Sequence, residues 1–183
     1  MNWFRYLAVS VALTAACMGM HASTRAATDG LLSSSSTGTS NITLNKGDLV
    51  QINNLTDVRF ANWTAGMGAQ NATGDACVYS TTGGYLVKAL SSSNQTGFAL
   101  SDGGSNFIPY DLDWSDRQRR PETRVSLENG ITYPRPLRSA ELLNCGDVGG
   151  TNVTFTVKLS AADLQAAPVG SYADILTFIV VPE

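Results

Sequence analysis

The chain has 183 residues, with 12 Lys and Arg, 15 Asp and Glu and a single His, which gives a formal net charge of -3 at pH 7. Only 15% of the residues are charged, and Gly, Ser, Thr and Asn are frequent, a composition typical of β-rich, turn-rich exported proteins rather than helical cytosolic enzymes. The acidic balance excludes a general attraction to nucleic acid or anionic lipid, and the length predicts one domain.

The N-terminus has the three parts of a secretory signal. Residues 1–26 comprise a short positive start at Arg5, an apolar stretch and a run of small residues suited to cleavage. We therefore predict export to the periplasm, the cell surface or the extracellular space, with no transmembrane segment after signal removal. The alternative is a lipoprotein anchored through Cys17, although Thr14 stands where such sites usually carry an aliphatic residue.

Signal removal also takes away most catalytic chemistry. The single histidine, His21, lies in the segment that is lost or at its frayed end, so a Ser-His-Asp triad, a Cys-His pair and a histidine-ligated zinc site each lack a member. We therefore expect a non-enzymatic protein without a cofactor or metal, and acid catalysis by carboxylates is the weakest alternative. Cys77 and Cys145 remain and predict a disulfide in an oxidising compartment. The alternative is a redox-active pair of free thiols, but the two cysteines do not have the CxxC spacing of such pairs.

After the signal, residues 27–40 carry almost no apolar periodicity and predict a flexible N-terminal arm. Residues 41–183 form a succession of short runs with period-two alternation, separated by turn residues. This pattern predicts a single all-β domain, an antiparallel β-sandwich with Ig-like or Greek-key wiring. The predicted strands lie at residues 41–44, 49–52, 57–63, 76–80, 84–90, 97–101, 107–114, 152–160 and 171–183.

The run at 107–114 places apolar residues, including Trp114, on one face and Asp111, Asp113 and Ser115 on the other. We interpret the second face as solvent-exposed. The alternative is that Asp111, Asp113 and Asp116 bind calcium or act on sugars, but the spacing lacks the glycine and the distal glutamate of a calcium loop. Trp114, like Trp63, is in step with apolar neighbours, which favours a core position over a sugar-stacking platform.

The last run, residues 171–183, is apolar on both faces from Ile175 onward. It is too short for a membrane helix, which needs about 20 residues, and the other runs lack the lipid-facing band of a barrel. It therefore predicts a strand that is covered on both faces. Its neighbour in the sheet is expected to be either the protein's own residues 42–52 or an arm of another subunit.

Five motifs, in order, resemble the spore coat protein U family, which includes the pilins of archaic chaperone-usher pili. They are V-x-F-x-x-W at 58–63, C-V-Y-S at 77–80, G-Y-L-V at 84–87, I-P-Y-D-L at 108–112 and P-V-G-S-Y-A-D-I-L-T-F-I-V at 168–180. The resemblance covers residues 42–183. It implies an incomplete Ig-like sandwich that meets a periplasmic chaperone and an usher, is completed by a strand of the next subunit and self-associates into fibres.

The strand-pairing surface that the resemblance implies consists of Ile42, Leu44, Ile175, Leu176, Phe178, Ile179 and Val180. The sequence departs from the family in two places. The first strand, LVQIN at 49–53, lacks the early cysteine that often pairs with the position of Cys77, and the arm offers only Ile42 and Leu44 as apolar pegs before Lys46. A self-complete monomeric domain therefore remains an alternative.

Half of the 12 Lys and Arg residues lie between positions 117 and 138. One interpretation is a solvated hairpin whose charges are balanced by Asp116, Glu122 and Glu128. The other is a partner-binding loop of a secreted adhesin or carbohydrate-binding module. The residues concerned are Arg117, Arg119, Arg120, Arg124, Arg135 and Arg138.

Overall fold

The computed structural model describes residues 28–93, 95–116 and 123–183, and the chain divides into two units at Asn45 and Lys46. In the first unit, Thr28 and Thr39 form an isolated antiparallel bridge, with backbone N–H···O distances of 3.1 and 3.0 Å. The strand predicted at residues 41–44 does not form. The signal-peptide residues 1–26 and Cys17 lie outside the described residues.

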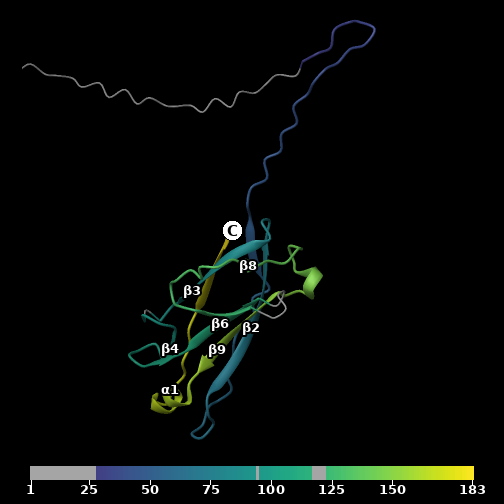
Figure 1. The fold of residues 1–183 in the computed structure, drawn as a ribbon. Helices are drawn as coiled ribbons and strands as arrows, with labels where there is room; N and C mark the ends of the chain where they lie inside the picture. The colour runs from purple at the N-terminus through teal and green to yellow at the C-terminus, as the bar shows by residue number, and fades with distance from the viewer. Residues whose placement is uncertain (1–27, 94, 117–122) are drawn as a thin grey trace, which may run out of the picture. The chain divides into compact units, whose positions relative to one another are not determined.

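The second unit is built almost entirely of β-strands, shown in Figure 1. Among the described residues, the single α-helix is α1 (Ala161–Ala166), and a 3-10 turn, η1, spans Gly146–Val148. The strands are β1 (Val50–Asn53), β2 (Gln70–Ser80), β3 (Gly84–Ser91), β4 (Ala99–Ser101), β5 (Phe107–Pro109), β6 (Asp111–Asp116), β7 (Thr123–Leu127), β8 (Leu137–Arg138), β9 (Val153–Leu159) and β10 (Leu176–Pro182).

The strands form one five-stranded sheet in the order β1-β2-β9-β6-β7, one three-stranded sheet in the order β10-β3-β8, and a two-stranded sheet of β4 and β5. Every strand pair in these sheets is antiparallel. The all-β, antiparallel prediction is therefore confirmed. The strict in-out burial alternation of β9 shows why: period-two patterning places Val153 and its alternate neighbours in the core.

An aromatic cluster joins the two larger sheets. Trp114 of β6 is fully buried, and its ring centroid lies 6.3 Å from that of Phe155 of β9 and 5.0 Å from that of Phe178 of β10. Its indole Nε1 donates a hydrogen bond to the Tyr85 hydroxyl of β3 at 3.0 Å. Burial, the largest cause, raises the pKa of Tyr85 well above its usual range. The core position predicted for Trp114 is confirmed.

The disulfide predicted between Cys77 and Cys145 is present and fully buried, and it links residues 68 positions apart. Beside it, the buried side chain of Asn152 completes the backbone pairing of β2. Its Oδ1 accepts from the Val78 N–H at 2.8 Å, and its Nδ2 donates to the Val78 carbonyl at 3.0 Å. The Val78 carbonyl also accepts a hydrogen bond from the Ala140 backbone N–H at 2.8 Å, so a side-chain amide and an isolated backbone group together pair with β2 here.

Two sequence predictions about individual strands were wrong. Asp113 and Ser115 are buried, at 7% and 6% exposure, rather than solvent-exposed. The reason is that β6 lies in the interior of its sheet, between β9 and β7, and Lys158 of β9 forms an ion pair over Asp113. Residues 57–63 form no strand; Val58 and Phe60 pack against the core from an irregular segment.

The strand predicted at residues 76–80 is longer in the structure, because β2 already begins at Gln70. Gly74 is central to this difference. A Cβ on Gly74 would collide with the Phe155 ring of the neighbouring strand β9. The glycine marks close packing inside a strand rather than a turn.

Candidate functional site: the open edge of the last strand

Strand β10 lies at the end of its sheet. It pairs with β3 from Leu176 opposite Ser91 to Pro182 opposite Tyr85, and no other described strand pairs with it. Figure 1 shows this yellow strand running to the C-terminus. Residues of β1 and β10 approach within 8 Å between Cα atoms, but β1 belongs to the other sheet and pairs with β2. Of the two alternatives for its neighbour, residues 42–52 do not pair with the last strand in the described chain, and the sheet neighbour is β3.

The hydrogen bonds at the two ends of β10 determine which backbone groups face outward. The Ser92 N–H donates to the Ile175 carbonyl at 3.1 Å, and the Glu183 N–H donates to the Gly84 carbonyl at 3.3 Å. Alternate residues of an antiparallel strand bond to the same side, so odd-numbered residues from Ile175 to Glu183 face β3. The N–H and C=O groups of Leu176, Phe178 and Val180 consequently point to the outer edge, where the described residues supply no ladder partner.

The side chains of β10 are also poorly covered. Ile179 and Val181 are each exposed at 42%, and Ile175, which precedes the strand, is exposed at 72%. Leu176, Phe178 and Val180 face the core but are only partly buried. The prediction that this strand is covered on both faces is therefore wrong. Periodicity records which faces are apolar, and it contains no information on whether another element lies over them.

Asp174 fixes the start of the last strand. Its Oδ2 accepts hydrogen bonds from the Tyr110 hydroxyl at 2.6 Å and the Ser91 hydroxyl at 2.7 Å. Its Oδ1 accepts from the backbone N–H and the hydroxyl of Ser92, at 2.9 and 2.8 Å. Burial and then the hydrogen bond to Asp174 raise the pKa of Tyr110 above its usual range. The exposed edge is therefore anchored at one end by a network of charge-assisted bonds.

The other two predicted strand-pairing residues lie in the first unit. Ile42 and Leu44 are 95% and 88% exposed and belong to no strand. Because they are two positions apart, an extended backbone would direct both side chains to one side. They therefore have the spacing of a donor strand that inserts two apolar side chains.

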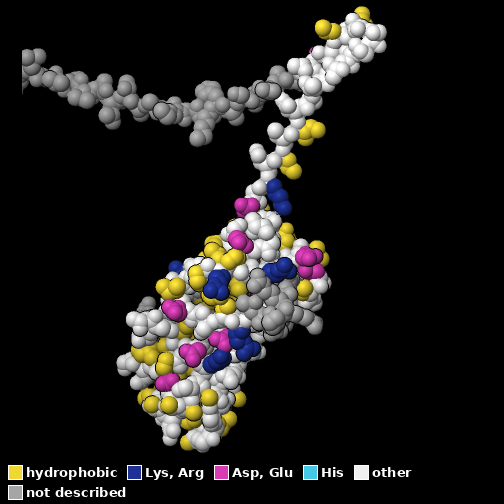
Figure 2. All heavy atoms as spheres, viewed as in Figure 1, with side chains coloured by type: hydrophobic (Ala, Val, Ile, Leu, Met, Phe, Trp, Pro, Cys, Tyr) yellow, Lys and Arg dark blue, Asp and Glu magenta, His cyan; other side chains and the backbone are white. Residues whose placement is uncertain are grey.

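The predicted Arg-rich loop is only partly described. Arg117, Arg119 and Arg120 lie outside the described residues. Arg124, Arg135 and Arg138 are exposed. On the face drawn in Figure 2, the described Lys and Arg side chains are separated by polar and hydrophobic ones.

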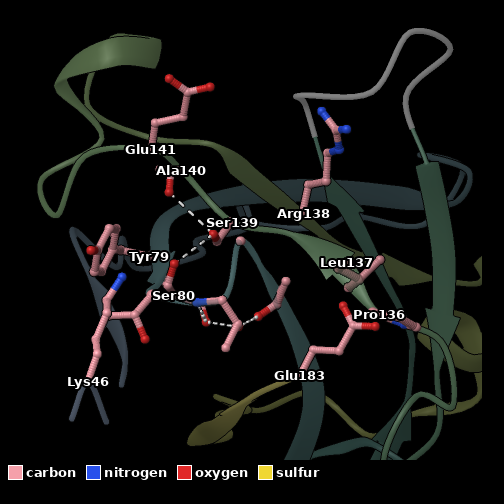
Figure 3. A pocket seen from close by; sticks show the side chains of 14 residues that line it. Lys46, Tyr79, Ser80, Pro136, Leu137, Arg138, Ser139, Ala140, Glu141 and Glu183 are labelled. Carbon is pink, nitrogen blue, oxygen red and sulfur yellow. Dashed lines mark hydrogen bonds between the residues drawn. The ribbon is translucent and has the colours of Figure 1, made fainter. Parts of the chain in front are cut away.

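A polar cleft of about 740 Å³ lies at one end of the second unit. In Figure 3, Lys46 and Tyr79 line one side, and Arg138 and Glu183 lie on the other. Hydroxyl groups of Ser80, Thr81, Thr82 and Ser139 also line it. Sequence reasoning missed this cleft because it combines the β2–β3 turn, strand β8 and the chain end, which are far apart in the sequence.

Two acidic residues of the 111–116 segment have structural partners. Asp113 pairs with Lys158, and the fully buried Asp116 accepts a hydrogen bond from the Arg138 backbone N–H at 2.9 Å. Within the described ranges, no group of three His, Cys, Asp or Glu side chains is placed to hold a metal ion. The same ranges contain no helix with the length and hydropathy to cross a membrane.

No family model, curated protein or solved structure matches this chain. The assignment of a function therefore depends on the geometry of the open edge.

Proposed function

We propose that this protein is an exported, non-enzymatic structural subunit whose Ig-like β-sandwich is completed by a strand from another subunit. The observation that carries the proposal is the outer edge of β10, where the backbone groups of Leu176, Phe178 and Val180 have no ladder partner among the described residues. An unpaired, uncharged strand edge readily accepts a further strand.

The chemistry of this addition is β-augmentation. A donor backbone bonds to the outward groups of β10, and its alternate side chains cover the half-buried Phe178 and Val180. The segment at residues 41–45 of the next subunit fits this role because Ile42 and Leu44 are exposed and alternate. A head-to-tail contact of this kind does not close, so repeated addition builds a pilus-type fibre. A periplasmic chaperone would protect the edge before assembly, and an usher would bring subunits together.

The test is a gel of protein sheared from its native source. Strand-exchanged subunits run as an SDS-resistant ladder that collapses to the monomer on boiling. The double variant Ile42→Asp with Leu44→Asp should lose the ladder, because charged side chains cannot enter the apolar edge. The matched control, Leu31→Asp with Leu32→Asp, changes two equally exposed residues of the same unit and should retain it.

A monomer band before and after heating of the unaltered protein would overturn the polymer assignment. A ladder that survives in the Ile42→Asp, Leu44→Asp variant would overturn the choice of donor segment.

A second candidate function is glycan binding in the polar cleft. It is favoured by the hydroxyl-rich lining, the aromatic ring of Tyr79 and the opposed charges of Arg138 and Glu141, since sugar sites combine planar rings with directional polar groups. Binding on a glycan array that is lost in Arg138→Ser but kept in Arg135→Ser, an exposed arginine outside the cleft, would support this function. An array without signal would exclude it.

A further inference from the structure

We infer that, in a subunit that carries neither a chaperone nor a donor strand, the open edge of β10 pairs with the β10 edge of a second copy of this chain. The dimer would be a two-fold symmetric, antiparallel extension of the three-stranded sheet. This inference rests on the open edge of the proposed function and concerns how the free subunit keeps that edge occupied.

The backbone pattern of β10 is self-complementary. The outward-facing residues are Leu176, Phe178 and Val180, as the hydrogen bonds of Ile175 and Glu183 to β3 determine. In an antiparallel pair centred on Phe178, Phe178 lies opposite its own copy, and Leu176 lies opposite Val180 of the second copy. Each outward N–H and C=O then has a partner. A shift of the axis to Ile179 brings Pro182, which has no N–H, into the ladder and leaves the Leu176 carbonyl of each chain without a donor.

The side chains favour the same arrangement. In this register Ile175 lies opposite Val181, and Thr177 lies opposite Ile179, on the outer face of the sheet. These apolar side chains are exposed at 72%, 42% and 42% for Ile175, Ile179 and Val181, and cross-strand pairing would cover part of that surface. No charged residue lies between Ile175 and Pro182, so the symmetric pair brings no like charges together.

Pairing of β10 with β10 of a second copy therefore involves a longer apolar stretch than pairing of β10 with the arm. The arm segment at 41–45 presents two apolar side chains, Ile42 and Leu44, whereas β10 from Leu176 to Pro182 is apolar at every position except Thr177. Pairing with a second copy and addition of a donor arm use the same backbone groups. The two states consequently exclude one another, and the dimer acts as a reversible cap on the assembly edge.

Register-specific cross-linking tests the inference. In a Cys17→Ser background, Thr177→Cys and Ile179→Cys each place one thiol on the outer face of β10, where both native residues are exposed. Opposite residues of a non-hydrogen-bonded pair have a Cα separation that a disulfide can span. An equimolar mixture of the two full-length variants should form a disulfide-linked dimer under mild oxidation, in about half of the pairs, because an isologous dimer mixes at random. Each variant alone should form little disulfide-linked dimer.

The outcomes separate the alternatives. A cross-link in Thr177→Cys alone or Ile179→Cys alone, at the yield of the mixture, would mean random collision or a shifted axis and would overturn the register. If the chain sediments as a monomer and the mixture forms no cross-linked product, the inferred dimer is wrong. That result would leave the SDS-resistant ladder and the proposed function untouched.

A further control adds Ile42→Asp and Leu44→Asp to the cysteine variants. Cross-linking should persist, because the arm takes no part in the pairing. Loss of the cross-link in this background would mean that arms, rather than the β10 edges, hold the two chains together, which would contradict the inference and support strand donation.

Discussion

Two proline substitutions, at neighbouring positions of β10, test the orientation of its backbone. The N–H of Ile179 faces β3, where Ile179 lies opposite Lys88, and the N–H of Val180 faces the outer edge. Proline removes the N–H and fixes φ, so it is tolerated at an edge and harmful inside a ladder. We expect Val180→Pro to leave the β3 pairing intact and Ile179→Pro to break it.

The magnitudes follow from these contacts. Val180 is only partly buried, and its replacement by proline should lower the free energy of unfolding by about 1 kcal/mol through lost apolar contact. Ile179→Pro removes a ladder hydrogen bond and leaves the opposite carbonyl without its donor, which together cost about 3 kcal/mol. The difference of about 2 kcal/mol corresponds to about 1 M in the urea midpoint for a domain of this size.

The assay is urea unfolding of the full chain at low protein concentration, followed by tryptophan fluorescence. Trp114 lies against Phe178 of β10 and reports the loss of this packing. Equal destabilisation by both substitutions, or a larger effect of Val180→Pro, would refute the assignment of inward and outward backbone groups. Under the proposed strand donation, the same Val180→Pro variant should also lose the SDS-resistant ladder, because it removes one N–H donor from the outer edge of β10.

Three further predictions concern the core. Replacing Cys77 and Cys145 together by alanine should lower the free energy of unfolding by about 4 kcal/mol, since the bridge closes a loop of 68 residues; a loss below about 1 kcal/mol in urea unfolding would contradict this. Gly74→Ala should destabilise by about 2 kcal/mol because its Cβ meets the Phe155 ring, whereas the control Gly97→Ala, with no atom near its Cβ, should change the midpoint little. Burial raises the pKa of Tyr85, so above pH about 10 the unfolded chain loses the phenol proton while the folded chain keeps it, and the free energy of unfolding should fall by about 1.4 kcal/mol per pH unit. The urea midpoint should therefore fall less steeply between pH 9 and 11 for Tyr85→Phe than for the unaltered protein. Identical slopes would contradict the assignment.

The sequence determined the class of fold and the inward faces of the runs at 107–114 and 152–160. Alternation at 152–160 placed Phe155 and its alternate neighbours inward, and β9 has this burial pattern. The cysteine inventory predicted the Cys77–Cys145 bridge. These features depend on residues close together in the chain or on a pair with no other partner, so local pattern and counting were sufficient.

Only the tertiary structure decided which strands lie at the edges of the sheets. The sequence showed that the last strand is apolar on both faces, but the pairing of β10 with β3 alone left one side open and exposed Ile179 and Val181. The interior place of β6 likewise buried Asp113, which alternation had assigned to solvent. Strand order depends on contacts between residues far apart in the chain, and period-two patterning is the same for an edge strand and a central one.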